Sequence, residues 1–235
     1  MSEQLSPRKV RFSSHDVLAK IGSFLQLDRY VVTYPLFKAG KFSSPTTLVN
    51  VHRRDAVAGI VHIVGHGAHH GHQSLLLVEQ FRMPTLLDPE TGAPDFERID
   101  SELQNAGRIL ELMAGVRRDG EPPLESFRRE CLEETNLTLT KVVHINSTYP
   151  SPGACSEKIH LFYGRVDWPE AEPWPKTDSP EHSNFGDDSE DIRRHFYTID
   201  EFFSKIENGT IVDGKCLCAA EWMRRPAISR EFFNR

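Results

Sequence analysis

The sequence predicts an α/β (α+β) fold, with mixed β-sheets sandwiched between helices and a β-rich N-terminal extension. Short runs rich in β-branched and aromatic residues recur from Tyr30 onward and indicate strands. One central segment, 122–135, carries acidic and apolar residues at helical spacing. The end of the chain adds one strand pattern and two short helical patterns.

Composition bounds the class of protein. At 235 residues the chain suits one large domain, or a domain with a small extension. Its net charge of −6 argues against a nucleic-acid partner, which favours a basic face. We find no apolar run long enough for a membrane span and no apolar signal segment. Four cysteines without a C-x-x-C pair fit reduced thiols, so we expect a cytoplasmic protein.

The elements follow in order. Residues 1–28 are mixed and suggest a short helix or arm. Strands are expected at 30–37, 46–51, 56–64 and 75–81, with the histidine-rich segment 65–72 as a hairpin loop. A polar stretch, 84–107, leads to a strand at 108–112, and Asn136 is suited to end the helix 122–135. Further strands are expected at 142–147, 159–166 and 193–198, a long loop at 168–191, and helices at 200–207 and 214–224.

The helix 122–135 carries the candidate chemistry. Glu130, Glu133 and Glu134 stand at i, i+3 and i+4, so three carboxylates share one face. Like charges at this spacing repel, and a bound cation would relieve the repulsion. Oxygen ligands favour Mg²⁺, or Mn²⁺ as a substitute. Arg129 can reach Glu133 one turn on.

The same helix offers a second face. Leu124, Phe127 and Cys131 fall at i, i+3 and i+7, which predicts docking into a core. The simpler alternative for three glutamates is a solvated acidic face. The spacing of the surrounding residues argues against it.

That surrounding segment resembles the Nudix box, so the Nudix fold is expected. The residues in register are Gly115, Glu121, Arg129, Glu130, Glu133, Glu134 and Leu137, with Cys131 at an apolar position and Asn136 in place of a glycine. The resemblance implies Glu130 and Glu134 as principal metal ligands and Glu133 as a secondary one, with the Ala114 carbonyl as a further ligand. For Glu121 a metal role and a structural role both stay open.

Five segments outside or flanking the box resemble the ADP-ribose pyrophosphatase branch of that family. They are VEQFR (78–82), ELMAG (111–115), SPGACSEKIHLFYGRV (151–166), DDSEDI (187–192) and GTIVDGKCLCAAEWM (209–223). The resemblance implies a catalytic set of Glu134 and Glu130, with Asp188 or Glu190 as the base. It also implies a homodimer and substrate contacts from Phe24, Arg82, Glu111, Ser151 and Glu157.

The resulting expectation is a hydrolase of a small nucleoside-diphosphate substrate, with a segment at 1–54 for dimerisation and substrate and a Nudix domain at 55–235. ADP-ribose, cleaved to AMP and ribose 5-phosphate, is the first substrate choice. An arginine pair typical of the branch is missing at Thr47–Val49, and the stretch 84–107 is long. Both features keep ADP-glucose, UDP-glucose and GDP-mannose open as alternatives, and a non-catalytic nucleotide sensor is a third hypothesis.

Overall fold

The computed structural model describes residues 10–22, 25–37, 40–95, 107–175 and 191–233, and 181–183 as backbone only. The chain divides into two compact units. The first comprises Met1–Asp55 and Tyr149–Lys158, and the second comprises Ala56–Thr148 and Ile159–Arg235. The segment Tyr149–Lys158 thus groups with the N-terminal part, although the boundary expected at 54/55 assigned it to the second domain.

The first unit is a three-stranded antiparallel sheet in the order β1-β2-β3. Its strands are β1 (Arg11–Ile21), β2 (Leu25–Thr33) and β3 (Thr46–Arg53). The expected helix or arm over residues 1–28 is therefore wrong for 11–21, and the strand expected at 30–37 begins and ends earlier. The reason is non-local: β1 is exposed throughout, and its ladder with β2 makes it a strand.

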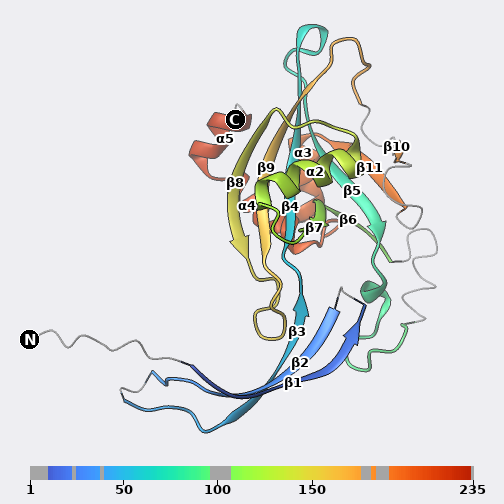
Figure 1. Cartoon of the computed structure of the whole chain (residues 1–235). Coiled ribbons are helices and arrows are strands. Elements are labelled where there is room, and N and C mark those ends of the chain that lie inside the picture. Colours follow the sequence, from blue (N-terminus) through green and yellow to red (C-terminus); the bar gives the residue numbers. More distant parts are fainter. Residues whose placement is uncertain are drawn as a thin grey trace, which may run out of the picture. The chain divides into compact units, whose positions relative to one another are not determined.

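The second unit contains one large sheet in the order β10-β11-β5-β4-β9-β8, with β6 paired to β5 and β7 paired to β4 (Figure 1). The strand pair β4 (Ala56–Gly65) and β9 (Ile159–Trp168) is parallel, and the other pairings are antiparallel. The remaining strands are β5 (Gln73–Phe81), β6 (Arg108–Glu111), β7 (Met113–Val116), β8 (Lys141–Thr148), β10 (Glu181–Ser183) and β11 (Ile192–Tyr197). The short 3₁₀ helices are η1 (Gly67–His69), in the β4–β5 hairpin, and η2 (Met83–Leu86). The sequence predicted neither β7 nor β10 as a separate strand.

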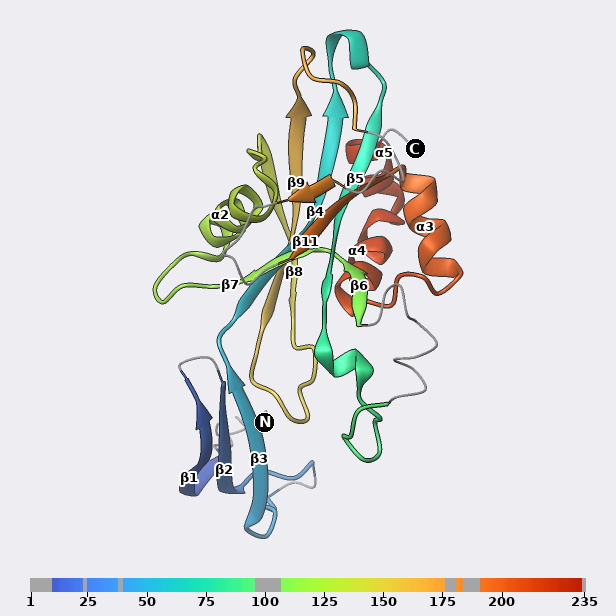
Figure 2. The same ribbon diagram turned by 90° about the vertical axis from the view of Figure 1, so that its right-hand side faces the viewer.

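Helices cover both faces of this sheet. The helix α2 (Pro123–Thr135) lies on one face, and α3 (Ile199–Glu207), α4 (Gly214–Met223) and α5 (Pro226–Phe233) lie on the other (Figure 2). The predicted α/β class, with a mixed sheet between helices, is confirmed. The helix α5 was not predicted.

Side chains along the central strands point alternately to the two faces of the sheet and so form two layers of hydrophobic core. In β9, Leu161 and Tyr163 join the cluster under α3, α4 and α5, whereas Phe162 and Val166 join the cluster under α2. Successive side chains of a strand point to opposite faces, so a continuous apolar run can serve both layers. This burial on both sides holds β4 and β9 at the centre of the unit.

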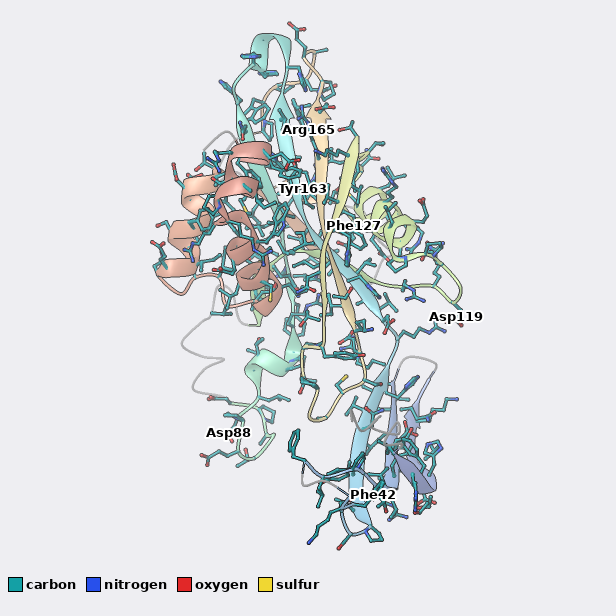
Figure 3. The ribbon with its side chains drawn as sticks, turned by 90° about the vertical axis from the view of Figure 1, so that its left-hand side faces the viewer. Phe42, Asp88, Asp119, Phe127, Tyr163 and Arg165 are labelled. Carbon is teal, nitrogen blue, oxygen red and sulfur yellow. The ribbon has the colours of Figure 1, made fainter. Side chains whose placement is uncertain are left out.

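The helix α2 packs closely on the sheet through Phe127, which lies between the helix and the strands (Figure 3). A Cβ placed on Gly59 of β4 would fall 2.5 Å from the Phe127 ring, so the glycine is required for this approach. Cys131 is also fully buried, but Leu124 is 37% exposed. The prediction that Leu124 docks into the core is therefore wrong: it lies in the first turn of the helix, and the buried face of the helix begins only at Ser126 and Phe127.

The end of α2 follows the sequence prediction. Asn136 adopts φ 55° and ψ 26°, and its N–H donates to the Leu132 carbonyl. Asparagine tolerates this left-handed conformation better than most residues other than glycine. Separately, no helix in the described residues is long and apolar enough to cross a membrane.

Candidate active site

The strand β7 and the helix α2 bring Gly115 and Glu130 into direct contact. A Cβ on Gly115 would fall 2.0 Å from Cδ of Glu130 and 2.2 Å from its Oε2. The Glu130 carboxylate therefore lies against the backbone of β7, where only glycine leaves room for it. Ala114, the neighbour of Gly115, pairs with Ala58 of β4, so a rigid central strand fixes this position.

Arg129 organises the carboxylates around it. Its Nε donates to Oε1 of Glu121 at 2.9 Å, and its Nη2 donates to Oε2 of the same residue at 2.9 Å. Its Nη1 lies 2.7 Å from Oε2 of Glu133 and 2.8 Å from Oε1 of Glu130. The predicted contact between Arg129 and Glu133 is confirmed.

The geometry favours the structural role of Glu121. Its hydrogen bonds from Arg129 lower its pKa to about 2, so it stays charged and paired. Its Oε2 also accepts a hydrogen bond from the backbone N–H of Arg118 at 3.2 Å. Glu121 thus ties the loop before α2 to the helix itself.

Glu133 and Glu134, the remaining two glutamates of α2 in the predicted metal site, differ in exposure. Glu134 is 6% exposed, while the side chain of Glu133 is 46% exposed and also receives Nη2 of Arg118 at 3.1 Å. In the described part of the chain, no three His, Cys, Asp or Glu side chains converge closely enough to hold an ion by themselves. The chemistry of the donor set still fits a hard divalent cation, because Glu130, Glu133 and Glu134 all offer carboxylate oxygens and the Glu130 carboxylate occupies the space that Gly115 leaves beside β7.

A second group of charges lies at the ends of β5 and β6. Nε of Arg82 donates to Oε1 of Glu111 at 2.6 Å, and Nζ of Lys215 donates to Oε2 at 3.0 Å. Lys215 also donates to Oδ1 of Asp213 at 2.8 Å. Sequence reasoning gave no role to Lys215 or Asp213, although both lie in the segment 209–223 that it had singled out. The sequence feature that could have pointed to them is the placement of an aspartate and a lysine at the start of the predicted helix 214–224.

The remaining predicted site residues lie in the first unit or outside the described residues. Ser151 is exposed, and its carbonyl accepts the N–H groups of Ala154 and Cys155 in a turn. Glu157 is 7% exposed, with Oε2 3.4 Å from Nη1 of Arg53. Phe24, Asp188 and Glu190 lie outside the described residues.

The histidines of the β4–β5 hairpin have separate partners. His62 is fully buried; its Nδ1 lies 2.9 Å from the Tyr163 hydroxyl and its Nε2 lies 3.1 Å from Oε1 of Gln73. Burial lowers the pKa of His62 to about 4, so it is neutral near pH 7. His66 contacts Oδ1 of Asp167 at 2.8 Å. These contacts give His62 and His66 structural roles.

Comparison with known proteins gives a family match and several relatives. The model of the NUDIX domain family matches residues 58–220, more than half of the chain. An ADP-ribose pyrophosphatase of Haemophilus influenzae is 28% identical over 151 residues, which cover 64% of this chain and 60% of that protein. An ADP-ribose pyrophosphatase of Escherichia coli K12 is 30% identical over 116 residues, which cover 49% of this chain and 52% of that protein. A GDP-mannose pyrophosphatase of Yersinia enterocolitica is 30% identical over 149 residues, covering 63% and 65%.

The matched region thus spans between about half and two thirds of the length of these relatives. Among solved structures, one described as the crystal structure of an ADP compounds hydrolase aligns with a TM-score of 0.59 at 15% identity. It covers 93% of this chain and 94% of that chain. At this identity the likeness supports the fold alone.

Proposed function

Because the chain belongs to the NUDIX domain family, we propose that it is a Nudix hydrolase that uses Mg²⁺ to cleave the diphosphate of ADP-ribose into AMP and ribose 5-phosphate. One observation carries the proposal above all. The Glu130 carboxylate lies in a recess that exists only because residue 115 is glycine, with Glu133 and Glu134 on the same stretch of helix. A solvated acidic helix has no need of such a recess.

The metal ligands we propose are Glu130, Glu134 and the Ala114 carbonyl, with Glu133 as a secondary ligand. When bound there, Mg²⁺ (or Mn²⁺ in its place) neutralises charge on the phosphate oxygens and lowers the pKa of a bound water. The burial of Glu134, at 6% exposed, keeps this carboxylate out of bulk solvent, which strengthens its interaction with a cation.

Arg129 has a supporting role in this proposal. It balances part of the negative charge of Glu121, Glu130 and Glu133, with Arg118 as a second cation at Glu133. Its bidentate bond to Glu121 fixes the guanidinium plane, so the glutamates of α2 are held near the recess at Gly115. Arg129 therefore positions ligands and is not proposed to contact the substrate.

The base that takes a proton from water is proposed to be Asp188 or Glu190. Both lie outside the described residues, and the choice between them is left to experiment. Their chain neighbour Asp191 forms an ion pair with Arg108 of β6, three residues before Glu111. Asp188→Asn and Glu190→Gln, each measured for kcat across a range of pH, would identify the base. The assignment fails when neither change lowers kcat.

The substrate is proposed to meet Arg82 through its diphosphate, because a guanidinium forms paired hydrogen bonds with phosphate oxygens. Direct contacts from Phe24, Glu111, Ser151 and Glu157 remain predictions from resemblance. A nucleoside-diphosphate sugar is the second candidate substrate, favoured by the 30% identity to a GDP-mannose pyrophosphatase.

We further propose a homodimer. The first unit exposes large apolar side chains that a second copy of the chain would cover, namely Phe12, Val17, Ile21, Leu48 and Val49. Light scattering during gel filtration would measure the mass, and a monomer at micromolar concentration would refute the dimer. A cytoplasmic setting is proposed as well, since the four cysteines are free thiols; fractionation of the source cells would test it.

The first test is a substrate panel with Mg²⁺. Nucleoside monophosphate release is measured from ADP-ribose, ADP-glucose, UDP-glucose and GDP-mannose. The highest kcat/KM for ADP-ribose supports the first proposal, and a preference for a nucleotide sugar transfers the proposal to that substrate. Nucleotide binding without turnover of any of the four would favour the non-catalytic sensor.

A matched pair of variants tests the metal site. Glu134→Gln removes one charge from a buried ligand with little change of shape, and kcat should fall by at least about 100-fold. Glu125→Gln makes the same change in the exposed first turn of α2 and should leave kcat unaltered. Equal kcat for both variants at saturating Mg²⁺ would exclude Glu134 from the metal site.

A further inference from the structure

A line of four charged side chains connects the start of α4 with the end of β5. Arg82 donates to one carboxylate oxygen of Glu111, and Lys215 donates to the other. Lys215 also donates to Asp213, the residue that caps α4. Two cations and two carboxylates therefore alternate, and each contact joins opposite charges.

Three of these four side chains are largely buried, which strengthens the contacts between their charges. The Glu111 side chain is 2% exposed, that of Asp213 is 8% and that of Lys215 is 17%. Burial disfavours the Lys215 ammonium, but the carboxylates of Asp213 and Glu111 more than offset this, so the pKa of Lys215 lies above its usual value. A buried carboxylate needs partners for both oxygens, and among the described residues Arg82 binds one oxygen of Glu111 and Lys215 binds the other.

The inner end of the line is anchored to backbone. Oδ2 of Asp213 accepts the N–H of Cys216 at 3.3 Å and that of Leu112 at 3.4 Å. Leu112 connects β6 to β7 and lies two residues before Ala114. Lys215 thus rests on a carboxylate that is fixed to both the helix and the strand connection.

The outer end of the line faces solvent. The Arg82 side chain is 41% exposed, and in the described part of the chain it bonds through Nε. Its two terminal nitrogens are therefore donors for an anionic ligand. The direction of the guanidinium is set by Glu111, whose own position depends on Lys215.

We infer that Lys215 is a positioning residue, which holds Glu111 and thereby aims the Arg82 guanidinium at the diphosphate of the substrate. The inference rests on the proposed function of the same site. It gives Glu111 the task of supporting Arg82, in place of a direct contact with ribose or base. Lys215 itself is not assigned a contact with substrate.

The test is a double-mutant cycle on the full-length protein. Lys215→Met and Arg82→Ala are made singly and together, and KM and kcat are measured with the best substrate of the panel. Lys215→Met should raise KM about tenfold, with kcat within about threefold of the wild type. In the Arg82→Ala background the same change should have almost no effect on KM, because the residue through which Lys215 acts is gone.

Two controls separate positioning from loss of structure. Lys141→Met removes a half-exposed lysine that lies 3.9 Å from Glu231, and KM should not change. Lys215→Arg keeps a cation at the site and should recover at least half of the lost affinity. Where Lys215→Met fails to fold, Lys215→Gln takes its place in the cycle; it removes the positive charge that holds Glu111 but keeps a polar side chain, so KM should rise in the same direction and by less than with methionine.

The outcomes are distinct. Additive effects of the two substitutions on KM, or a fall in kcat with KM unchanged, would overturn the inference. If the wild type turns over no substrate, the proposed function fails, and the same cycle is run on the Kd of ADP-ribose measured by calorimetry in EDTA. Non-additive Kd values would then support the role of Lys215, and additive values, or no binding by the wild type, would overturn it.

Discussion

Replacing Gly115 by alanine should separate metal binding from folding. The new Cβ would fall 2.0 Å from Cδ and 2.5 Å from Cγ of Glu130. Carbon atoms in contact stay about 3.5 Å apart, so the carboxylate must withdraw by roughly 1.5 Å. Metal–ligand distances tolerate only about 0.2 Å. Alanine at position 115 therefore removes Glu130 from the proposed site.

The magnitude follows from this displacement. Disturbing a residue that merely supports a metal ligand costs about 10–100-fold in affinity or activity, so displacing a ligand should cost at least as much. We expect the Kd for Mn²⁺ to rise at least about tenfold and kcat to fall at least about 100-fold. Stability should change by less than about 1 kcal/mol, because the Glu130 side chain can rotate and Gly115 lies in a strand without a positive φ.

Mn²⁺ binding is measured by electron paramagnetic resonance. Turnover is measured with the best substrate of the panel, and stability is measured by urea denaturation. Gly214→Ala is the matched control, since its Cβ would meet no atom within 4 Å. Wild-type Mn²⁺ affinity and turnover in Gly115→Ala would refute the reasoning, because Glu130 would then not be a ligand in this recess. A large loss of stability would refute the claim that the recess serves binding and not folding.

Three further predictions concern stability. His62 has a pKa of about 4 in the folded protein and about 6.5 when unfolded, so the unfolded chain binds more protons between these values. The free energy of unfolding should therefore fall by up to about 3 kcal/mol as the pH drops from 6.5 to 4. Urea titrations at several pH values should show that the free energy of unfolding depends less steeply on pH in His62→Gln than in the wild type. Gly59→Ala should cost about 3 kcal/mol in urea denaturation, because its Cβ would fall 2.5 Å from both the Phe127 ring and the backbone oxygen of Phe162. Adding Phe127→Leu relieves the first contact alone and should restore part of the loss; no restoration would contradict the argument that Gly59 makes room for Phe127. Arg129→Lys should cost about 2 kcal/mol in the same assay, since a lysine cannot make the bidentate bond to Glu121, and an unchanged urea midpoint would count against that bond.

The sequence was most informative where structure is local. The helix α2 begins within a residue of its predicted start and ends as predicted, because helical spacing and the left-handed preference of Asn136 are properties of adjacent residues. The strand β1 was missed because its side chains are exposed and do not alternate in polarity; its conformation depends on pairing with β2.

The same distinction applies to the candidate site. The contact between Arg129 and Glu133 spans one helical turn and could be predicted. The structural role of Glu121 required the loop before α2 to fold back on the helix, which spacing alone did not decide. The contact between Glu111 and Lys215 joins residues that are far apart in the chain, so no local pattern could reveal it.

The parallel pairing of β4 with β9 also has a consequence for the order of folding. Ala56 pairs with Ile159, about a hundred residues later, so a long loop must close before this ladder forms. Phe127 packs against both strands: Cβ atoms on Gly59 and Gly164 would fall 2.5 Å and 3.0 Å from its ring. The helix α2 thus gains its full docking surface only after this long-range pairing is complete. Newly made chains should acquire secondary structure before they acquire metal affinity, and the delay between the two in a refolding experiment would measure the closure of that loop.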